Sequence, residues 1–454
     1  MVMLFQKLKH FFIIFFVGLF VLCNQKVWCG RLNFFLNILD PIDSEVFIYI
    51  EKIILVSNHH NIEILVNKRV SSYSDFAQYF LVTKEVPPTK YKQVYIKTSR
   101  SELKFSIDLS VQSKDSICLF LFWHVKDSIK YKKDFIDLRQ QKKPIGEDTI
   151  YISCEDIDTI FALRTDLNQI QASIGIEGFP QDLVLNSQEK LYVLSAKKRS
   201  LYIIDIGSFQ VIDRILLPLL TSPRYFILLP NQKIIVTDPY SQYVIKLDLS
   251  SGELLASKRL GHRPLELFYA SQERLIFISS PLDQTVFVLT PDLSLRKRFS
   301  VQSPRGLLAV KSYLYVAEYD PGMVGVFDLS SGQNLYRIKT GRGSLHIHQV
   351  GRRLFITNEK EGSLAILRLG QRSISKKIFL GGQPFTLTSC ARRRWLYVTD
   401  RQRRALMVID LTAEKKVGEV KLGGIPFGIS SSTQSQEGAR EWLLNKPFFV
   451  PSGF

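Results

Sequence analysis

A short strand-like run recurs seven times between about residues 149 and 430, and this repeat constrains the fold more than any other feature. In order, the runs are TIYIS at 149, LYVLS at 191, IIVTD at 234, LIFIS at 275, LYVAE at 314, LFITN at 354 and LYVTD at 396. Their second residues are separated by 42, 43, 41, 39, 40 and 42 positions. A fixed period of about 40–45 residues with several strand signals per unit is typical of a β-propeller. We therefore predict an all-β chain with a seven-bladed β-propeller over residues 148–431.

Each unit contains four strand signals that grade from apolar to polar. The first is a proline-led apolar run such as PFTLT at 384, and the second is the LYV-type run described above, such as LYVTD at 396. The third is a run such as LMVID, which ends at Asp410, and the fourth is a polar run such as EVKLGG at 419. An inner strand pressed between neighbouring blades should be apolar, whereas an outer edge strand should alternate and carry lysine or arginine. One unit has GSLHI at 343 and lacks the proline.

The order of the strand signals predicts how the ring closes. The first LYV-type run has no proline-led run directly before it, and the last unit is followed by an extra one, IPFGIS at 425. We expect this strand to return and complete the first blade beside residues 149–153, because closure removes the open edge of a linear array.

The repeat resembles the YVTN-type seven-bladed propellers of bacterial surface and periplasmic proteins. The residues that carry the resemblance are LYVTD at 396, the VID that ends at Asp410, and the GGxPFG-like segments at 381 and 423. Two units depart from the pattern at the end of the third strand, where Thr290 and Arg368 replace the usual aspartate. The resemblance implies a binding scaffold.

The first 29 residues are typical of an export signal or a membrane anchor. Lys7 and Lys9 precede the apolar run FFIIFFVGLFVL at 11–22, which is short for a membrane span. A cleaved secretory signal is the favoured interpretation. The alternatives are a lipoprotein acylated at Cys23, whose preceding Leu22 is bulky, and an uncleaved anchor.

Residues 31–140 lack the period and instead show alternating runs such as LKFSIDLSV at 103. This pattern predicts an antiparallel β-sandwich. The segments FLVTKEVPPTKYKQVYIK, LKFSIDLSVQ and CLFLFWHVKDSI are similar to uncharacterised prealbumin- or Ig-like domains at the front of bacterial lipoproteins. We expect a polar linker at 136–147 and a tail at 432–454.

Charge and cysteine content narrow the choice of partners. The net charge of +18 suits anionic lipid, glycan or another envelope polymer in an exported protein, and the leader argues against nucleic acid. The alternative is that lysine and arginine simply keep the protein soluble. Cys118, Cys154 and Cys390 match no metal or haem motif, and free thiols are favoured over a disulfide between Cys154 and Cys390.

Four arginines flank the proline position of consecutive blades and form the candidate site. They are Arg224, Arg263, Arg305 and Arg342. Guanidinium groups gathered at the mouth of a central channel could bind carboxylate or phosphate through paired hydrogen bonds. The alternative is that each arginine pairs locally with an acid such as Glu266.

Two further clusters are interpreted structurally. The turn Arg401–Arg404 of the last blade should adjoin the acidic turn CEDID at 154 in the first blade, so that opposite charges meet where the ring closes. His346 and His348 alternate along one strand and could face one side, but no third metal ligand is evident.

No catalytic motif is found in the sequence. The ring of channel positions is expected to hold Asp182 and Glu266 among Tyr225, Gly306, Leu345, Thr386 and Gly428. Two acids are sparse for catalysis, so we predict a non-catalytic, monomeric envelope protein without cofactor or metal that binds a protein or an anionic glycan or lipid. The alternatives are a propeller hydrolase or lactonase, and a structural surface-layer component.

Overall fold

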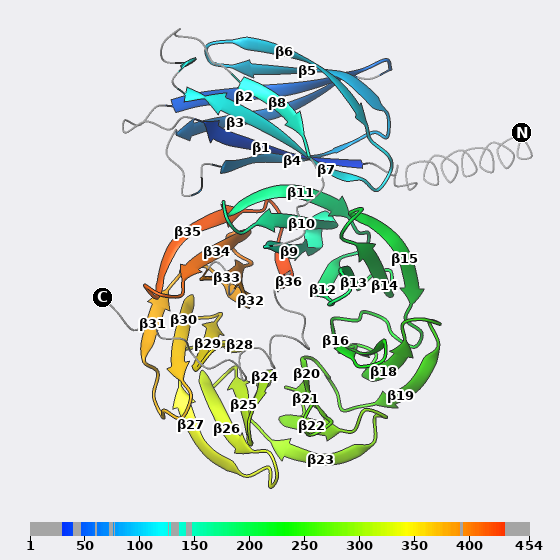
Figure 1. Ribbon diagram of the computed structural model, residues 1–454, viewed down its shortest axis with the longest axis vertical. Coiled ribbons are helices and arrows are strands. Elements are labelled where there is room, and N and C mark those ends of the chain that lie inside the picture. The colour runs from blue at the N-terminus through cyan, green and yellow to red at the C-terminus, as the bar shows by residue number, and fades with distance from the viewer. Residues whose placement is uncertain are drawn as a thin grey trace, which may run out of the picture.

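The computed structural model of the chain describes residues 30–39, 47–59, 61–71, 76, 78–125, 127–128, 136–141, 148–390 and 394–431. These residues form an all-β architecture of four-stranded sheets (Figure 1). No helix within the described ranges is long and apolar enough to cross a membrane. The predicted leader, residues 1–29, and the predicted tail, residues 432–454, lie outside the described residues.

Two four-stranded sheets precede the repeats and share one apolar core. Their strand orders are β4-β1-β7-β8 and β3-β2-β5-β6. Phe34 and Trp123 of the first sheet belong to the same buried cluster as Ile53 and Tyr91 of the second. The strands are β1 (Gly30–Leu39), β2 (Phe47–Ser57), β3 (Asn61–Ser71), β4 (Gln78–Val86), β5 (Lys90–Thr98), β6 (Glu102–Ser110), β7 (Ser116–His124) and β8 (Ile136–Gln140).

The predicted linker at 136–147 is partly wrong, because its first five residues form β8 and pair antiparallel with β7. Ile136 is buried in the core of these two sheets, and Leu138 packs against it. Asp137 lies between these two apolar residues, and Arg139 and Gln140 follow them, so the strand looks polar in sequence.

From Thr149 onward, the chain forms a series of four-stranded antiparallel sheets arranged around a centre (Figure 1). The first joins β11 (Gln169–Gly175), β10 (Thr159–Arg164), β9 (Thr149–Cys154) and β36 (Pro426–Ser431), with a short 3-10 helix, η1 (Glu155–Ile157), between β9 and β10. The next three are β12 (Pro180–Leu185), β13 (Lys190–Ser195), β14 (Ser200–Asp205), β15 (Gln210–Leu216); β16 (Tyr225–Leu229), β17 (Lys233–Thr237), β18 (Tyr243–Asp248), β19 (Leu254–Arg259); and β20 (Leu267–Ala270), β21 (Leu275–Ser280), β22 (Thr285–Leu289), β23 (Leu295–Ser300).

Three more sheets complete the described series. They are β24 (Pro304–Val310), β25 (Tyr313–Glu318), β26 (Met323–Asp328), β27 (Asn334–Lys339); β28 (Ser344–Val350), β29 (Arg353–Asn358), β30 (Ser363–Arg368), β31 (Lys376–Phe379); and β32 (Pro384–Cys390), β33 (Trp395–Asp400), β34 (Ala405–Asp410), β35 (Lys415–Lys421). Middle strands are buried almost throughout, as in β34, whereas outer strands alternate, as in β19. This burial follows the predicted gradient from apolar to polar runs.

The predicted return of the last strand is confirmed, because β36 pairs antiparallel with β9. Pro426 lies opposite Cys154, and Ser431 lies opposite Ile150. The strands that start at or shortly after the proline position (β12, β16, β20, β24, β28, β32 and β36) surround the hub in Figure 1.

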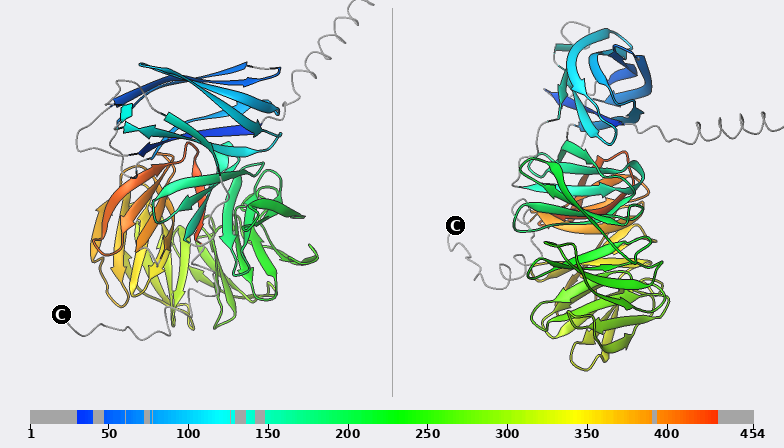
Figure 2. Two further views of the ribbon diagram at one scale, coloured as in Figure 1. Left: turned by 45° about the horizontal axis from the view of Figure 1, so that its top comes forward. Right: turned by 90° about the vertical axis from the view of Figure 1, so that its right-hand side faces the viewer.

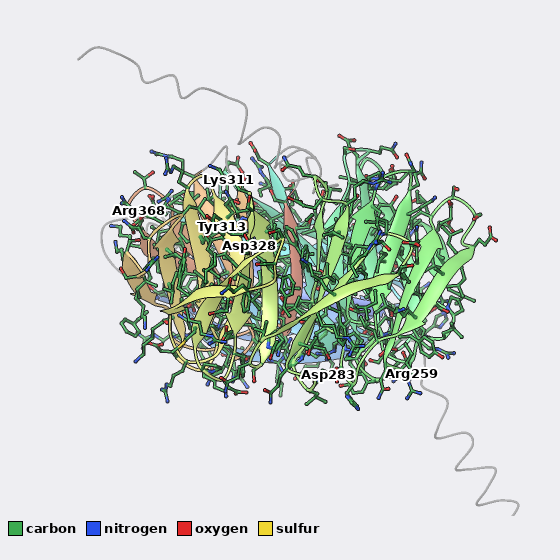
Figure 3. The ribbon with its side chains drawn as sticks, turned by 90° about the horizontal axis from the view of Figure 1, so that it is seen from below. Arg259, Asp283, Lys311, Tyr313, Asp328 and Arg368 are labelled. Carbon is green, nitrogen blue, oxygen red and sulfur yellow. The ribbon has the colours of Figure 1, made fainter. Side chains whose placement is uncertain are left out.

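The inner strands begin at one face, here called the proline face, and end at the opposite face. Figure 3 shows Asp283, of the turn after β21, and Arg259, at the end of β19, on one side, and Lys311 and Asp328 toward the other. Because successive strands of a sheet run antiparallel, each outer strand starts at the opposite face and ends at the proline face.

The sheet that contains β1 and β7 packs against β11 (Figure 2). The ring of Phe35 lies 5.5 Å from that of Phe80, 5.6 Å from that of Phe120 and 6.2 Å from that of Phe161. Asn33 Nδ2 donates hydrogen bonds to Ser116 Oγ at 2.9 Å and, across the joint, to Ser173 Oγ at 3.3 Å. The N-terminal sheets and the repeat region therefore share a buried joint.

Candidate functional site

Apolar side chains fill the proline end of the hub. Leu265, Leu345, Phe385 and Phe427 directly follow the proline position of their strands and form one buried cluster with Tyr225. The ring of Phe427 lies 5.1 Å from that of Phe385 and 5.5 Å from that of Tyr225. Burial raises the pKa of Tyr225 to about 12, so its hydroxyl stays neutral.

Two arginines lie over the aromatic rings of this cluster. The guanidinium carbon of Arg224 is 5.4 Å from the ring centre of Phe427. Arg401 lies 5.8 Å from the same ring and 5.0 Å from that of Phe385. Among the described residues, the buried Nε of Arg224 has no hydrogen-bond partner. Sequence reasoning assigned Arg401 to ring closure and missed its place at the hub.

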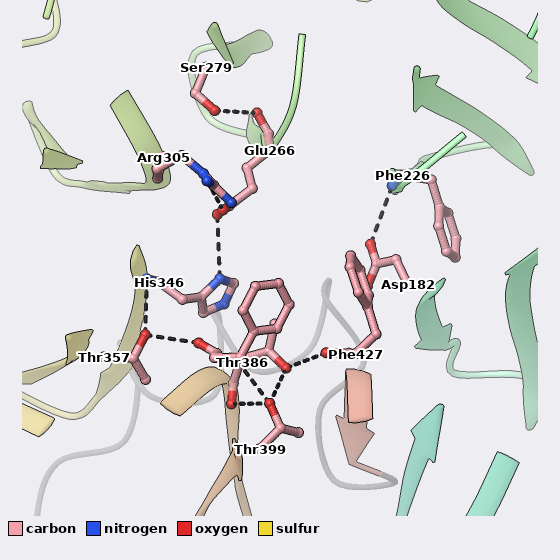
Figure 4. Close-up of polar contacts among 11 residues, drawn as sticks. Asp182, Phe226, Glu266, Ser279, Arg305, His346, Thr357, Thr386, Thr399 and Phe427 are labelled. Atoms are coloured by element: carbon pink, nitrogen blue, oxygen red, sulfur yellow. Dashed lines mark hydrogen bonds and ion pairs between the residues drawn. The ribbon is translucent and has the colours of Figure 1, made fainter. Parts of the chain in front are cut away.

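The side chains of Arg305 and His346 both lie beside the carboxylate of Glu266 (Figure 4). Arg305 Nε is 3.7 Å from Glu266 Oε1, and His346 Nδ1 is 3.4 Å from Glu266 Oε2. Glu266 is 6% exposed, so this carboxylate is buried between its two partners. The local pairing considered as the alternative thus applies to Arg305.

The structure divides the four predicted arginines into two pairs. Arg224 and Arg305 directly follow a proline and are half-buried at the hub. Arg263 and Arg342 precede the inner strand and are exposed in turns. The backbone N–H of Arg342 donates to Glu361 Oε2 at 2.9 Å, and that of Arg263 donates to Ser280 Oγ at 3.4 Å. An arginine directly after the proline position therefore reaches the hub, whereas one that precedes this position stays at the surface.

Asp182 occupies the hub without a cationic side chain bound to it in the described residues. Its carboxylate accepts hydrogen bonds from the backbone N–H of Leu183 at 3.0 Å and of Phe226 at 3.3 Å (Figure 4). Burial raises the pKa of Asp182 to about 7, although these two backbone donors act in the other direction. Asp182 could therefore exchange a proton near neutral pH.

The expected ring of hub positions is wrong by one residue in the unit that lacks proline. Ser344 pairs with Asn358 as Pro384 pairs with Asp400, so Ser344 takes the place of proline. His346, rather than Leu345, is then equivalent to Glu266. Without proline as a marker, the sequence offers no sign of this register.

His348 lies beside the inner strand of the next sheet, with its Nε2 3.0 Å from Ser389 Oγ. Burial, and then the charge of His346, lower the pKa of His348 to about 3, so it is neutral at physiological pH. In the part of the chain that the structure describes, no group of three or more His, Cys, Asp or Glu side chains is placed to hold a metal ion. Cys118, Cys154 and Cys390 are buried free thiols.

The predicted meeting of opposite charges at the closing sheets is confirmed. Arg401 Nη2 lies 2.5 Å from Glu155 Oε1, and Arg404 Nη1 lies 3.0 Å from Asp156 Oδ2. Asp156 also accepts a hydrogen bond from the backbone N–H of Ile425 at 2.6 Å. These contacts fix the start of β36 against the first sheet.

No protein family matches the sequence, and no curated protein is similar to it. Among solved structures, a functionally unknown protein from Desulfotomaculum acetoxidans DSM 771 matches with a TM-score of 0.55 and 14% identity, over 63% of this chain and 99% of that chain. A protein provisionally assigned as a 6-phosphogluconolactonase, from Bacteroides fragilis NCTC 9343, matches with a TM-score of 0.54 and 14% identity, over 64% and 99% of the two chains. These likenesses show a propeller-type fold for the matched part of this chain.

Proposed function

We propose that this chain is a non-catalytic, exported binding or scaffold protein of the cell envelope. Its sheets from β9 to β36 would be the seven blades of a YVTN-type propeller that β36 closes, and its first two sheets would be the prealbumin- or Ig-like sandwich. The export signal predicted from residues 1–29, the net charge of +18 and the repeat pattern support this assignment. An envelope protein or an anionic glycan or lipid would be the partner of a monomer.

The observation that carries the proposal is the pair of arginines on Phe427. Two guanidinium groups within 5.8 Å of one ring centre repel each other unless negative charge lies nearby. Glu155 balances Arg401, but no ion pair of Arg224 occurs among the described residues. Arg224 is thus positioned to bind a carboxylate, sulfate or phosphate that reaches the proline face, and the exposed Arg263 and Arg342 would attract such a group.

The test is to titrate Arg224→Ala with oligogalacturonate, a carboxylate polymer, by calorimetry at low salt. We expect roughly a tenfold or greater rise in Kd, because a hydrogen bond to a charged group contributes about 1.5–3 kcal/mol. Removal of both Arg263 and Arg342 should have a smaller effect that salt abolishes, since exposed charges are screened.

Arg298→Ala is the matched control. Arg298 belongs to the outer strand β23, and its guanidinium carbon lies 5.2 Å from the ring centre of Phe287 in β22. The substitution removes the same charge and the same type of ring contact away from the hub. Equal losses in Arg224→Ala and Arg298→Ala would mean that net charge alone binds the polymer, and an unchanged Kd in Arg224→Ala would exclude the hub.

A hydrolase or lactonase is the second candidate, and the pKa of Asp182 favours it. A group with a pKa of about 7 can act as a general acid or base at neutral pH. Lactone hydrolysis that Asp182→Asn abolishes would support the enzyme. Absence of hydrolysis over a panel of lactones, together with intact oligogalacturonate binding, would support the scaffold.

A further inference from the structure

Most outer strands of the repeat sheets are protected from pairing with another chain. β7 packs against β11. The outer strands β19, β23, β27, β31 and β35 present exposed lysine or arginine, namely Arg259, Arg296, Arg298, Arg337, Lys339, Lys376, Lys415 and Lys421. Charged side chains on an edge strand discourage the addition of a further strand.

β15 differs from these strands because three of its seven residues are exposed aliphatic side chains, which lie beside the exposed polar residues Gln210 and Asp213. All of its residues except Ile215 are exposed, including Val211 at 40%, Ile212 at 53% and Leu216 at 66%. The only cation of β15, Arg214, is turned back onto its own sheet: its Nε donates to Ser200 Oγ at 3.0 Å, and its guanidinium lies 5.4 Å from the ring centre of Tyr202. An edge strand with several exposed aliphatic side chains and no free cation is a suitable strand-docking site, and Asp213 is its one acidic residue.

We propose that the C-terminal segment 441–450, EWLLNKPFFV, docks along β15. Six of its ten residues are tryptophan, leucine, phenylalanine or valine, whereas the preceding segment 432–440, STQSQEGAR, is polar. The polar spacer would let the apolar segment reach a strand away from the end of β36, and contact with the apolar residues of that strand would remove both from water. Pro447 is compatible with an outermost strand, where one N–H side faces solvent.

The position of β36 brings this segment within reach. β36 ends at Ser431 beside the sheet of β15, since the backbone N–H of Leu185 in β12 donates to Ser430 Oγ at 3.1 Å. β36 ends, and β15 begins, at the face opposite the prolines. Three strand spacings of about 4.8 Å separate β12 from β15, about 14 Å in all. Nine extended residues span roughly 30–32 Å, so the spacer 432–440 is long enough.

Hydrogen exchange of the peptide 210–219 tests the proposal in the full chain and in a chain that ends at Ser431. The truncated chain keeps β36 and should fold. We expect exchange in this peptide to be about tenfold faster after truncation, because its amides lose a neighbouring strand. Equal exchange in the two chains would overturn the proposal.

Ile212→Lys in the full chain provides a second test, with Leu335→Lys in β27 as the matched control. Like Ile212, Leu335 is an exposed aliphatic residue of an outer strand, at 44%. Ile212→Lys should release the segment and raise chymotryptic cleavage after Trp442 about tenfold, while Leu335→Lys should behave as the wild type. Equal cleavage in all three proteins, or a dimer that only Ile212→Lys dissociates, would show that the segment does not occupy β15. Neither variant alters Arg224, so the result is independent of anion binding.

Discussion

At the residue scale, the second residue after the proline position differs in chemistry from one inner strand to the next. Glu266 there has Arg305 and His346 as partners, whereas the donors to Asp182 among the described residues are backbone N–H groups. Gly306 occupies the same position in the strand between Glu266 and His346, and a Cβ on it would lie 2.9 Å from the Cα of His346. The two carboxylates therefore occupy the same position of the inner strand in different electrostatic surroundings.

The raised pKa of Asp182 predicts a pH-dependent stability. Between about pH 4 and the folded pKa of about 7, the folded protein binds more protons than the unfolded chain, so its free energy of unfolding falls as pH rises. Asp182→Asn should remove this dependence, and its stability relative to wild type should increase by about 1–2 kcal/mol from pH 4 to pH 8. Denaturant unfolding across this range measures the difference, with the exposed Asp213→Asn as a control. A constant difference for Asp182→Asn would contradict the prediction.

At the element scale, the close approach of neighbouring inner strands depends on glycine. A Cβ on Gly428 of β36 would lie 2.7 Å from the carbonyl oxygen of Gln181 and 3.0 Å from the Cα of Asp182, both in β12. These are backbone atoms, which cannot move aside without shifting the strand. The closing strand is therefore held where a side chain would not fit.

Gly428→Ala should destabilise the protein by about 1–3 kcal/mol, the usual cost of adding a methyl group to a packed interior. Gly207→Ala, in the exposed turn between β14 and β15, is the control, because its nearest neighbour would be Asp205 Oδ1 at 3.5 Å. Thermal unfolding followed by circular dichroism compares the two. Equal melting temperatures would mean that β36 is free to move away from β12.

At the scale of the whole molecule, the N-terminal sheets and the repeat region are joined by a buried surface rather than by a linker alone. Phe35 and Phe120 belong to the same apolar cluster as Phe161 of β10 and Tyr397 of β33. A Cβ on Gly175 would lie 1.9 Å from the carbonyl oxygen of Lys114, so the backbones of the two parts also meet closely. Both parts should consequently unfold together.

Phe35→Ala should uncouple the unfolding of the N-terminal sheets from that of the repeat region. Truncation of a buried phenylalanine to alanine lowers the free energy of unfolding by about 3–5 kcal/mol. Here the lost contacts are those between the N-terminal sheets and the repeat region. Scanning calorimetry should show one transition for the wild type and two for Phe35→Ala. Phe277→Ala, in a core of the repeat region, should lower the temperature of a single transition. Two transitions in the wild type would show that the parts unfold independently.

Much of the repeat region could be predicted from the sequence, because local patterns carry that information. The runs at 149 through 396 lie in β9, β13, β17, β21, β25, β29 and β33, and the extra proline-led run is β36. The site was harder to predict. Arg224 and Arg305 reach the hub whereas Arg263 and Arg342 do not, since a shift of one or two residues from the proline changes where a side chain points.

The sequence by itself determined the strand period, because hydrophobic alternation and turn residues are local properties. The phase of the repeat also predicted the return of the last strand and the pairing of Arg401 and Arg404 with Glu155 and Asp156. Only the tertiary structure decided the register of β28, the stacking of Arg401 on Phe427 and the exposed apolar edge of β15. These features depend on which segments, far apart in the chain, come to lie side by side, and a single sequence does not record such neighbours.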